Sequence, residues 1–481
     1  MASMKQNHIK SFGDTAQAHK TPPGPVTRWG GWPWMQALAK DFTGFMQQLQ
    51  RQHGDITYSR VLWERIYTVF SPELMRKVVV DNAVHLIRQE RAVEVLAEAQ
   101  GQSVMVSEGE QWQRQHRMLM PGFAPRRVAG YANLMVNAAK RCLDEAGPKR
   151  QGSSALVNVT ELMSRLPMDV IMRTLFSSQA GEESLEVAEA VKVLDECAMD
   201  EFFWPTTLPD WLPLPGKARK RWALRVLNGL IDRHIRSRKQ MDPASAPTDD
   251  LLAMLLAVRD EAPDGATPAT QAATQGLSDT ELHDQCKIMF LAGYETTATA
   301  LTWWTWLMAA HPEIAERARH DIDSLIGQRD PTPEDMPKLE WLTATLKEAM
   351  RLYPPALGLV TRRTTADIQV DGWTIPKRSL VMVVHWVAQH DARWFPQPEA
   401  FKPERFMPDA PAIPRGAWMP FGAGPRVCIG QHFAMLEMTL IAAMLLQRYT
   451  LKTEPGEPPP RPEVKVTLRP ADVLRVRFTR R

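Results

Sequence analysis

The chain has no long uninterrupted apolar stretch. Of its 481 residues, 44% are hydrophobic and 23% are charged, a balance typical of globular proteins. No apolar run approaches the ~20 residues that a membrane span needs, and the polar first 20 residues lack the apolar region of a secretory signal. The sequence therefore predicts a cytoplasmic protein without a membrane span, long enough to bury a large core.

The chain also carries little net charge and contains few cysteines. The 58 Lys and Arg residues nearly balance the 55 Asp and Glu residues, giving a net charge of +3. This argues against a nucleic-acid partner, because such proteins usually carry a clustered basic excess. The four cysteines, Cys142, Cys197, Cys286 and Cys428, lie far apart without C-x-x-C spacing. That spacing argues against a disulfide framework or a four-cysteine zinc site and fits a reducing compartment.

The pattern of elements predicts a mainly α protein with small β-sheets. Proline clusters separate long stretches of helical periodicity, and strand signals are few. The predicted strands over 56–62 and 65–70 are close enough to pair as a hairpin, the segments 367–374 and 380–384 form a second group of strands, and 464–468 and 473–478 form a third.

Two helix starts match the S/T-x-x-E capping box. Ser107 lies three residues before Glu110, and Ser278 lies three residues before Glu281. The second start opens a helical run to about residue 309. Such a helix of ~32 residues would be roughly 48 Å long and would cross most of a globular domain.

Cys428 carries the strongest chemical signal. It stands among the glycines of 421–430 and directly precedes an apolar helical segment. Backbone N–H groups and the positive dipole end at a helix N-terminus favour a thiolate. Glycines let the backbone fold closely around the sulfur, and Arg426 adds a cation suited to an anionic group. A lone cysteine is usually a small buried apolar residue, but this context indicates an axial ligand for iron.

The pattern Phe421-x-x-Gly424-x-Arg426-x-Cys428-x-Gly430 resembles the heme-binding signature of the cytochrome P450 heme-thiolate monooxygenases. The resemblance covers nearly the whole chain and is to the stand-alone type without a fused reductase. It implies a P450-like fold, with a long central I helix over the heme and the cysteine loop before the L helix. It also implies a flexible tail over 1–20, a single heme domain over 21–481, and heme b bound through Cys428, Phe421, Arg426 and Gly430.

A second motif lies in the middle of the long helix. Glycine and adjacent threonines are poor helix formers, and this stretch reads Ala292-Gly-Tyr-Glu295-Thr296-Thr. Alone, it would indicate a tolerated helix irregularity. The resemblance assigns catalytic roles to Thr296, in stabilising bound dioxygen, and to Glu295, in proton delivery. It also implies that Ala292 and Gly293 leave room over the heme.

Further residues are assigned by the resemblance to the heme propionates. Trp112 and His116 share a helix face, although many family members carry arginine at the second position, and Arg117 is the alternative to His116. Arg362 has the expected spacing after the K helix, with Arg363 as its adjacent competitor. Arg426 is the third cation.

The pair Glu348 and Arg351 has the i, i+3 spacing of helix neighbours. Such pairs are commonly exposed and contribute little. The resemblance instead implies a buried structural network of Glu348, Arg351 and Arg405.

The implied reaction inserts one oxygen atom of O2 into a lipophilic small molecule such as a fatty acid or terpenoid. Electrons would come from NAD(P)H through a separate reductase with a ferredoxin or flavodoxin, docking on cations such as Arg114 and Lys347. The apolar candidates for the substrate pocket are Ile288, Met289, Ala292, Leu357, Leu359 and Val360. One alternative is a peroxide-using peroxygenase or isomerase, which often lacks the acid–alcohol pair formed here by Glu295 and Thr296. The other alternative is a non-catalytic heme sensor.

Overall fold

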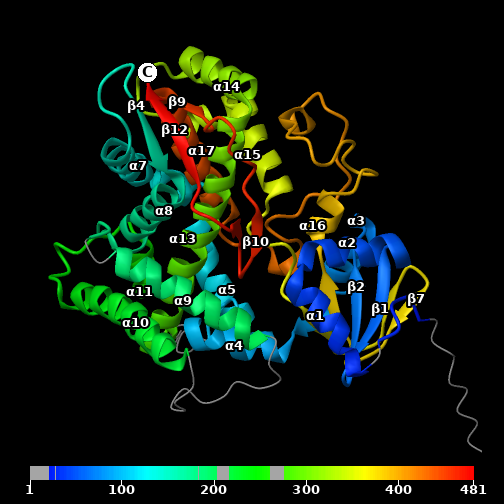
Figure 1. The fold of residues 1–481 in the computed structure, drawn as a ribbon. Coiled ribbons are helices and arrows are strands. Elements are labelled where there is room, and N and C mark those ends of the chain that lie inside the picture. The colour runs from blue at the N-terminus through cyan, green and yellow to red at the C-terminus, as the bar shows by residue number, and fades with distance from the viewer. Residues whose placement is uncertain (1–20, 28, 182–183, 203–215, 261–275) are drawn as a thin grey trace, which may run out of the picture.

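The computed structural model describes residues 21–27, 29–181, 184–202, 216–260 and 276–481. The tail predicted over 1–20 lies outside these residues. Figure 1 shows a large helical part beside a smaller part in which β1, β2 and β7 lie close to α1, α2 and α16. The chain is thus mainly helical with small sheets, as the sequence predicted.

The main helices of the described residues are α1 (Trp32–Lys40), α2 (Phe42–His53), α3 (Pro72–Arg76), α4 (Glu90–Gln100), α5 (Gly109–Leu119), α6 (Pro125–Gly130), α7 (Ala132–Ala146), α8 (Val159–Phe176), α9 (Ser184–Phe202), α10 (Lys217–Gln240), α11 (Leu251–Ala257), α13 (Asp279–Ala310), α14 (Pro312–Leu325), α15 (Glu340–Leu352), α16 (His385–Gln389) and α17 (Gln431–Arg448). The strands are β1 (Ile56–Val61), β2 (Glu64–Val69), β3 (Leu86–Arg88), β4 (Ser154–Asn158), β5 (Arg362–Thr364), β6 (Ile368–Val370), β7 (Trp373–Ile375), β8 (Leu380–Val383), β9 (Tyr449–Lys452), β10 (Pro462–Val464), β11 (Leu468–Pro470) and β12 (Arg475–Arg480).

The largest sheet has the strand order β1-β2-β8-β5-β3. The predicted hairpin at its edge is confirmed, since β1 pairs antiparallel with β2. The second predicted group contains three strands: β6 and β7 form a hairpin within 367–375, whereas β8 joins β2 in parallel.

The third predicted group divides between two sheets. The stretch 464–468 is not one strand, because it links β10 to β11 in a hairpin. The last strand, β12, pairs with β4 and β9, which come from distant parts of the chain. Periodicity alone could not select these partners.

The helix α13 begins as predicted. The Ser278 hydroxyl accepts a hydrogen bond from the Glu281 N–H at 3.2 Å, and the Ser278 N–H donates to Glu281 Oε2 at 2.9 Å. The other predicted start is wrong: α5 begins at Gly109 after Glu108, and Ser107 donates to Gln115 Oε1 at 2.8 Å instead.

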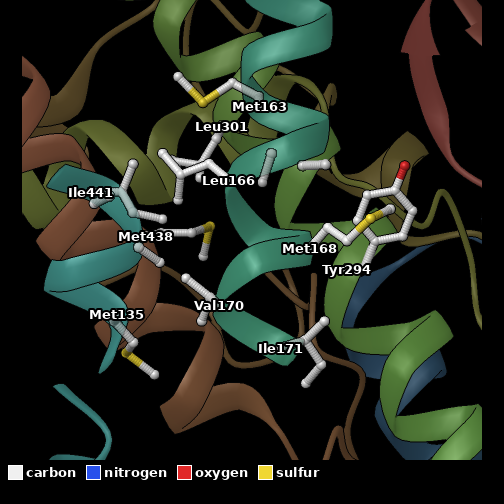
Figure 2. Close-up of a cluster of buried hydrophobic side chains, with 14 of the residues drawn as sticks. Met135, Met163, Leu166, Met168, Val170, Ile171, Tyr294, Leu301, Met438 and Ile441 are labelled. Carbon is white, nitrogen blue, oxygen red and sulfur yellow. The ribbon is translucent and has the colours of Figure 1, made fainter. Parts of the chain in front are cut away.

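The core of the helical part is built around α8 and α13. Figure 2 shows apolar side chains of α7, α8, α13 and α17 gathered between these helices. Three of the α8 side chains, Met163, Leu166 and Val170, have no exposed surface. This packing fixes α13 across the molecule. Among the described helices, none combines the length and apolarity required to cross a bilayer.

Candidate functional site

The loop before α17 positions Cys428 by close backbone packing. Gly424 opens the short helix η7 (Gly424–Arg426) with a φ of 74°, a left-handed conformation that favours glycine. A β-carbon there would lie 2.2 Å from the carbonyl oxygen of Val79. The Cys428 N–H donates to the Phe421 carbonyl at 2.9 Å and closes the loop.

The Cys428 side chain reaches an open face of this loop. It is exposed, although protein surrounds it closely enough for desolvation to raise the pKa of the thiol. The Gly430 N–H acts in the opposite direction and lowers that pKa. In the loop without iron, desolvation thus outweighs this nearby donor. A bound metal ion would reverse the balance, since coordination deprotonates a thiol.

Three arginines gather beside this loop around a single carboxylate, that of Glu108. Arg88 Nη1 donates to Glu108 Oε1 at 3.2 Å, and Arg426 Nη2 donates to Glu108 Oε2. Arg88 also pairs with Arg362 across β3 and β5. Arg362 makes no ion pair with any described residue, and its Nη1 donates only to the Val360 carbonyl, at 2.7 Å.

The arginines of this basic cluster destabilise one another's charge. Burial, followed by the charge of Arg88, lowers the pKa of Arg362 to about 10 and that of Arg426 to about 9. Burial also lowers the pKa of Arg88, whose Nε is buried without a hydrogen-bond partner among the described residues. The basic cluster consequently favours binding of an anion that bears more than one negative charge.

Trp112 and His116 extend the basic cluster along α5. The Arg426 guanidinium lies 3.9 Å from the centroid of the Trp112 ring, and the His116 ring lies 5.0 Å from it. Burial and then the charge of Arg426 lower the pKa of His116, which favours neutral imidazole.

Two competing arginines are placed elsewhere. Arg117 is exposed and binds Asp260 at 3.2 Å. Arg363 is held by Glu64 at 2.9 Å and by Glu90 at 2.6 Å. The structure thus brings together His116 and Arg362, rather than Arg117 and Arg363, with Arg426.

The middle of α13 has an open face. Ala292 is exposed, and the Thr296 hydroxyl donates to the Ala292 carbonyl at 2.7 Å. Gly293 does not share this face, because a β-carbon there would lie 3.2 Å from Ile171 of α8. Gly293 thus packs against α8 in the direction of its missing side chain, while Ala292 provides open space; room over the heme beside partly exposed Gly293 stays a prediction.

The other predicted pocket residues lie in different surroundings. Ile288 and Leu357 are buried, and Met289 belongs to the main helical core. Leu359 approaches Gly422 of the cysteine loop, and Val360 is partly exposed.

Comparison with known proteins bears directly on this arrangement. The cytochrome P450 family model matches residues 21–475. The chain belongs to the cytochrome P450 family. It is 33% identical to cyclooctat-9-en-7-ol 5-monooxygenase of Streptomyces melanosporofaciens, covering 84% of each chain. It is 30% identical to pentalenene oxygenase of Streptomyces avermitilis, covering 91% of this chain and 92% of the other.

A solved structure extends the comparison to the fold. Retinoic acid-bound cyanobacterial CYP120A1 is 26% identical, and the match covers 96% of this chain and all of the other, with a TM-score of 0.80. The P450-like fold predicted from the sequence is thereby confirmed, as is the class of enzyme, a P450 monooxygenase.

Heme b fits the residues of this P450. Three guanidinium groups and one carboxylate leave a net charge of two in the basic cluster, which matches the two propionates of the porphyrin. Arg88, Arg362 and Arg426 would bind these propionates, and Cys428 would provide the axial sulfur. Sequence reasoning missed Arg88, because its only signal is the pairing of two three-residue strands.

The predicted network behind the loop is present as a set of contacts. Arg351 binds both oxygens of Glu348 at 2.8 Å, and Arg405 reaches Glu348 Oε1 at 3.2 Å. Neither Glu348 nor Arg351 has exposed surface. Arg351 also donates to the Gln389 and Ala400 carbonyls, at 2.6 and 3.2 Å. These contacts join α15 to the segment that leads into the cysteine loop.

A buried acid, Glu437, was missed by the sequence reasoning. It lies on α17, nine positions after Cys428, with both carboxyl oxygens enclosed and no hydrogen-bond partner satisfying them among the described residues. Burial raises its pKa well above the ordinary value, while Thr297 of α13 lowers it to a lesser extent. Glu437 is therefore a neutral acid between the helix that follows the cysteine and the helix of Thr296.

Proposed function

We propose that this P450 oxygenates a cyclic, terpenoid-type hydrocarbon or a simple alcohol derived from one, in preference to a fatty acid. The observation that carries this proposal is the identity over most of the chain to two oxygenases named for cyclooctat-9-en-7-ol and pentalenene. The apolar character of Ile288 and Leu357 agrees with such a substrate. The heme, when bound, supplies oxygen activation, and its cysteine ligand donates electron density to that chemistry.

A ligand panel tests the substrate class. Cyclic hydrocarbons and their mono-alcohols should shift the ferric heme spectrum of the purified protein towards high spin at micromolar concentration, because they displace the axial water. Fatty acids of equal carbon number are the control. A shift with the fatty acids alone would overturn the terpenoid proposal while leaving the enzyme class intact.

We further infer that Thr296 and Glu295 deliver protons on the open face of α13. The Thr296 hydroxyl lies beside exposed Ala292, where it can hold a proton donor in place. Glu295 is the adjacent acid, and acids positioned near the reacting atoms are common proton donors. The peroxide-using alternative often lacks such an acid and hydroxyl, whereas this chain carries both Glu295 and Thr296.

Replacement of Thr296 by alanine should uncouple electron flow. Product formation is expected to fall by about 10²-fold, the lower end of the effect of positioned proton donors, while NAD(P)H oxidation continues and hydrogen peroxide accumulates. The matched control is Thr302→Ala, since Thr302 makes the same bond to the fourth preceding carbonyl at 2.7 Å but is buried. Equal coupling in Thr296→Ala and the parent enzyme would remove Thr296 from proton delivery.

Electrons are proposed to come from NAD(P)H through a separate reductase with a ferredoxin or flavodoxin. The predicted docking role of Arg114 is not supported, because Arg114 binds Glu281 at 2.5 Å and the Gly276 carbonyl at 2.9 Å. Lys347 is partly exposed on α15, whose carbonyl at this residue accepts from Trp418 of the segment before the cysteine loop. A single heme domain over 21–481 and a cytoplasmic location complete the proposal.

A further inference from the structure

Glu295 lies at a meeting point of three elements that are distant in the sequence. It belongs to α13, and the side chains facing it come from α9 and from the β10–β11 hairpin. None of these contacts involves Thr296, which bonds to its own helix. The surroundings of Glu295 are thus determined by partners outside the motif.

The hairpin provides a fixed donor. Thr467 Oγ1 donates to Glu295 Oε1 at 2.7 Å. The next residue, Leu468, is held on both sides: its carbonyl accepts from Trp303 Nε1 at 2.7 Å, and its N–H donates to the Pro355 carbonyl at 2.9 Å. Thr467 therefore occupies a defined position, and so does the Glu295 oxygen that it binds.

Asp195 of α9 faces Glu295 from the other side. The same hairpin adjoins both acids, since Thr467 donates to Glu295 and Arg469, two residues further on, lies beside Asp195 Oδ2; Glu295 is accordingly among the groups that raise the pKa of Asp195. The Asp195 Oδ2 atom is buried and has no hydrogen-bond partner among the described residues. The nearest cation, Arg469 of β11, is 3.9 Å away, beyond a hydrogen bond. Two carboxyls in such contact require a proton between them.

The remaining groups around Asp195 favour the neutral acid. Burial is the largest influence raising its pKa, Glu295 is the next, and Glu196 adds to them, while Arg469 acts in the opposite direction. Tyr294 of α13 also faces the pair, and burial together with the charge of Glu295 raises its pKa to about 12, so the phenol stays neutral. A neutral Asp195 carries a hydroxyl donor, and the oxygens of the Glu295 carboxyl can accept a hydrogen bond.

We propose that Asp195 is a positioning residue that donates a hydrogen bond to Glu295 and, with Thr467, holds this carboxylate in place for proton delivery. The proposal rests on the proposed role of Glu295. It adds a residue of α9 to the proton-delivery site on α13. The position of the Glu295 carboxyl then depends on whether Asp195 is protonated.

The dependence on pH follows from the direction of the shift. Because the pKa of Asp195 is raised in the folded protein, the hydrogen bond is complete in mild acid and is lost as the pH rises through that pKa. Once ionised, Asp195 repels Glu295, and only Thr467 still holds it. We therefore expect the fraction of electrons lost to hydrogen peroxide to increase with pH.

Two substitutions at Asp195 separate hydrogen bonding from packing. Asp195→Asn keeps a donor that cannot ionise, so the peroxide-to-product ratio should stay at its low-pH value across the range. Asp195→Leu keeps the branching at Cγ without a donor and should raise this ratio by about tenfold, the factor that one hydrogen bond to a charged group represents. The matched control is Glu189→Gln, on the same helix and paired with Arg219 at 3.4 Å, which should leave the ratio unchanged.

Infrared spectroscopy provides a readout independent of turnover. The difference spectrum between the holoenzyme and Asp195→Asn should show the C=O stretch of a protonated carboxylic acid that disappears on titration to high pH, because the band of buried Glu437 is common to both proteins and cancels. Absence of an Asp195-dependent band, or a coupling that responds to pH in Asp195→Asn as in the parent, would overturn the proposal. Failure of the Glu295 assignment would look different: the band would be present, while none of the Asp195 variants would alter coupling.

Discussion

Replacement of Cys428 by serine is expected to abolish NAD(P)H-dependent product formation, reducing it to the background rate. Serine keeps the size of the side chain in the loop but cannot donate electron density as a thiolate does. The reduced carbon monoxide complex of the variant should lose the thiolate-type spectrum. This measurement reports the ligand directly, independently of the substrate.

The chain offers a matched control for this substitution. Cys197 of α9 is a partly buried free thiol far from the loop, with a pKa that burial raises. Cys197→Ser should keep both the spectrum and turnover. A thiolate spectrum that survives in Cys428→Ser would mean that another residue coordinates the iron.

Replacement of Glu348 by alanine should produce the largest loss of stability. The change leaves Arg351 without a counter-charge in a place with no exposed surface, and it also removes the partner of Arg405. Breaking a buried ion pair in this way costs about 3–5 kcal/mol of unfolding free energy. Denaturant unfolding of the holoprotein, followed by heme absorbance and by far-UV circular dichroism, would measure this loss.

An exposed pair serves as the comparison. Arg165 and Glu145 lie 2.6 Å apart with 40% and 46% of their side chains exposed, so Arg165→Ala should cost only about 0–1 kcal/mol. A loss below 1 kcal/mol in Glu348→Ala would contradict a structural role for the network. The intermediate variant Glu348→Gln keeps hydrogen-bonding capacity and should lie between the two.

The local features of the site could be predicted from the sequence because they depend on neighbouring residues. The glycines around Cys428 and the capping box at Ser278 lie within a few positions of the groups that they serve. The same holds for Glu348 and Arg351, which are one helical turn apart. In each case the sequence spacing already fixes which atoms can meet.

Selection among neighbouring candidates needed the tertiary structure. His116 and Arg117 are equally plausible in the sequence, yet α5 turns His116 towards Trp112 and Arg117 towards Asp260. Arg114 has the positive charge expected of a docking residue, but Glu281 in the first turn of α13 binds it. Such choices depend on helix rotation and on partners far along the chain.

The sequence by itself determined the family, the candidate axial ligand and the acid–alcohol motif, because these are encoded in short spacings. Only the tertiary structure placed Arg88 beside Arg362, enclosed Glu437 against α13, and brought Asp195 to Glu295. The physical reason is that burial and charge clustering arise between elements that are remote in the sequence. A carboxyl that reads as an ordinary surface acid becomes a neutral donor only when the fold removes water and brings a second carboxyl against it.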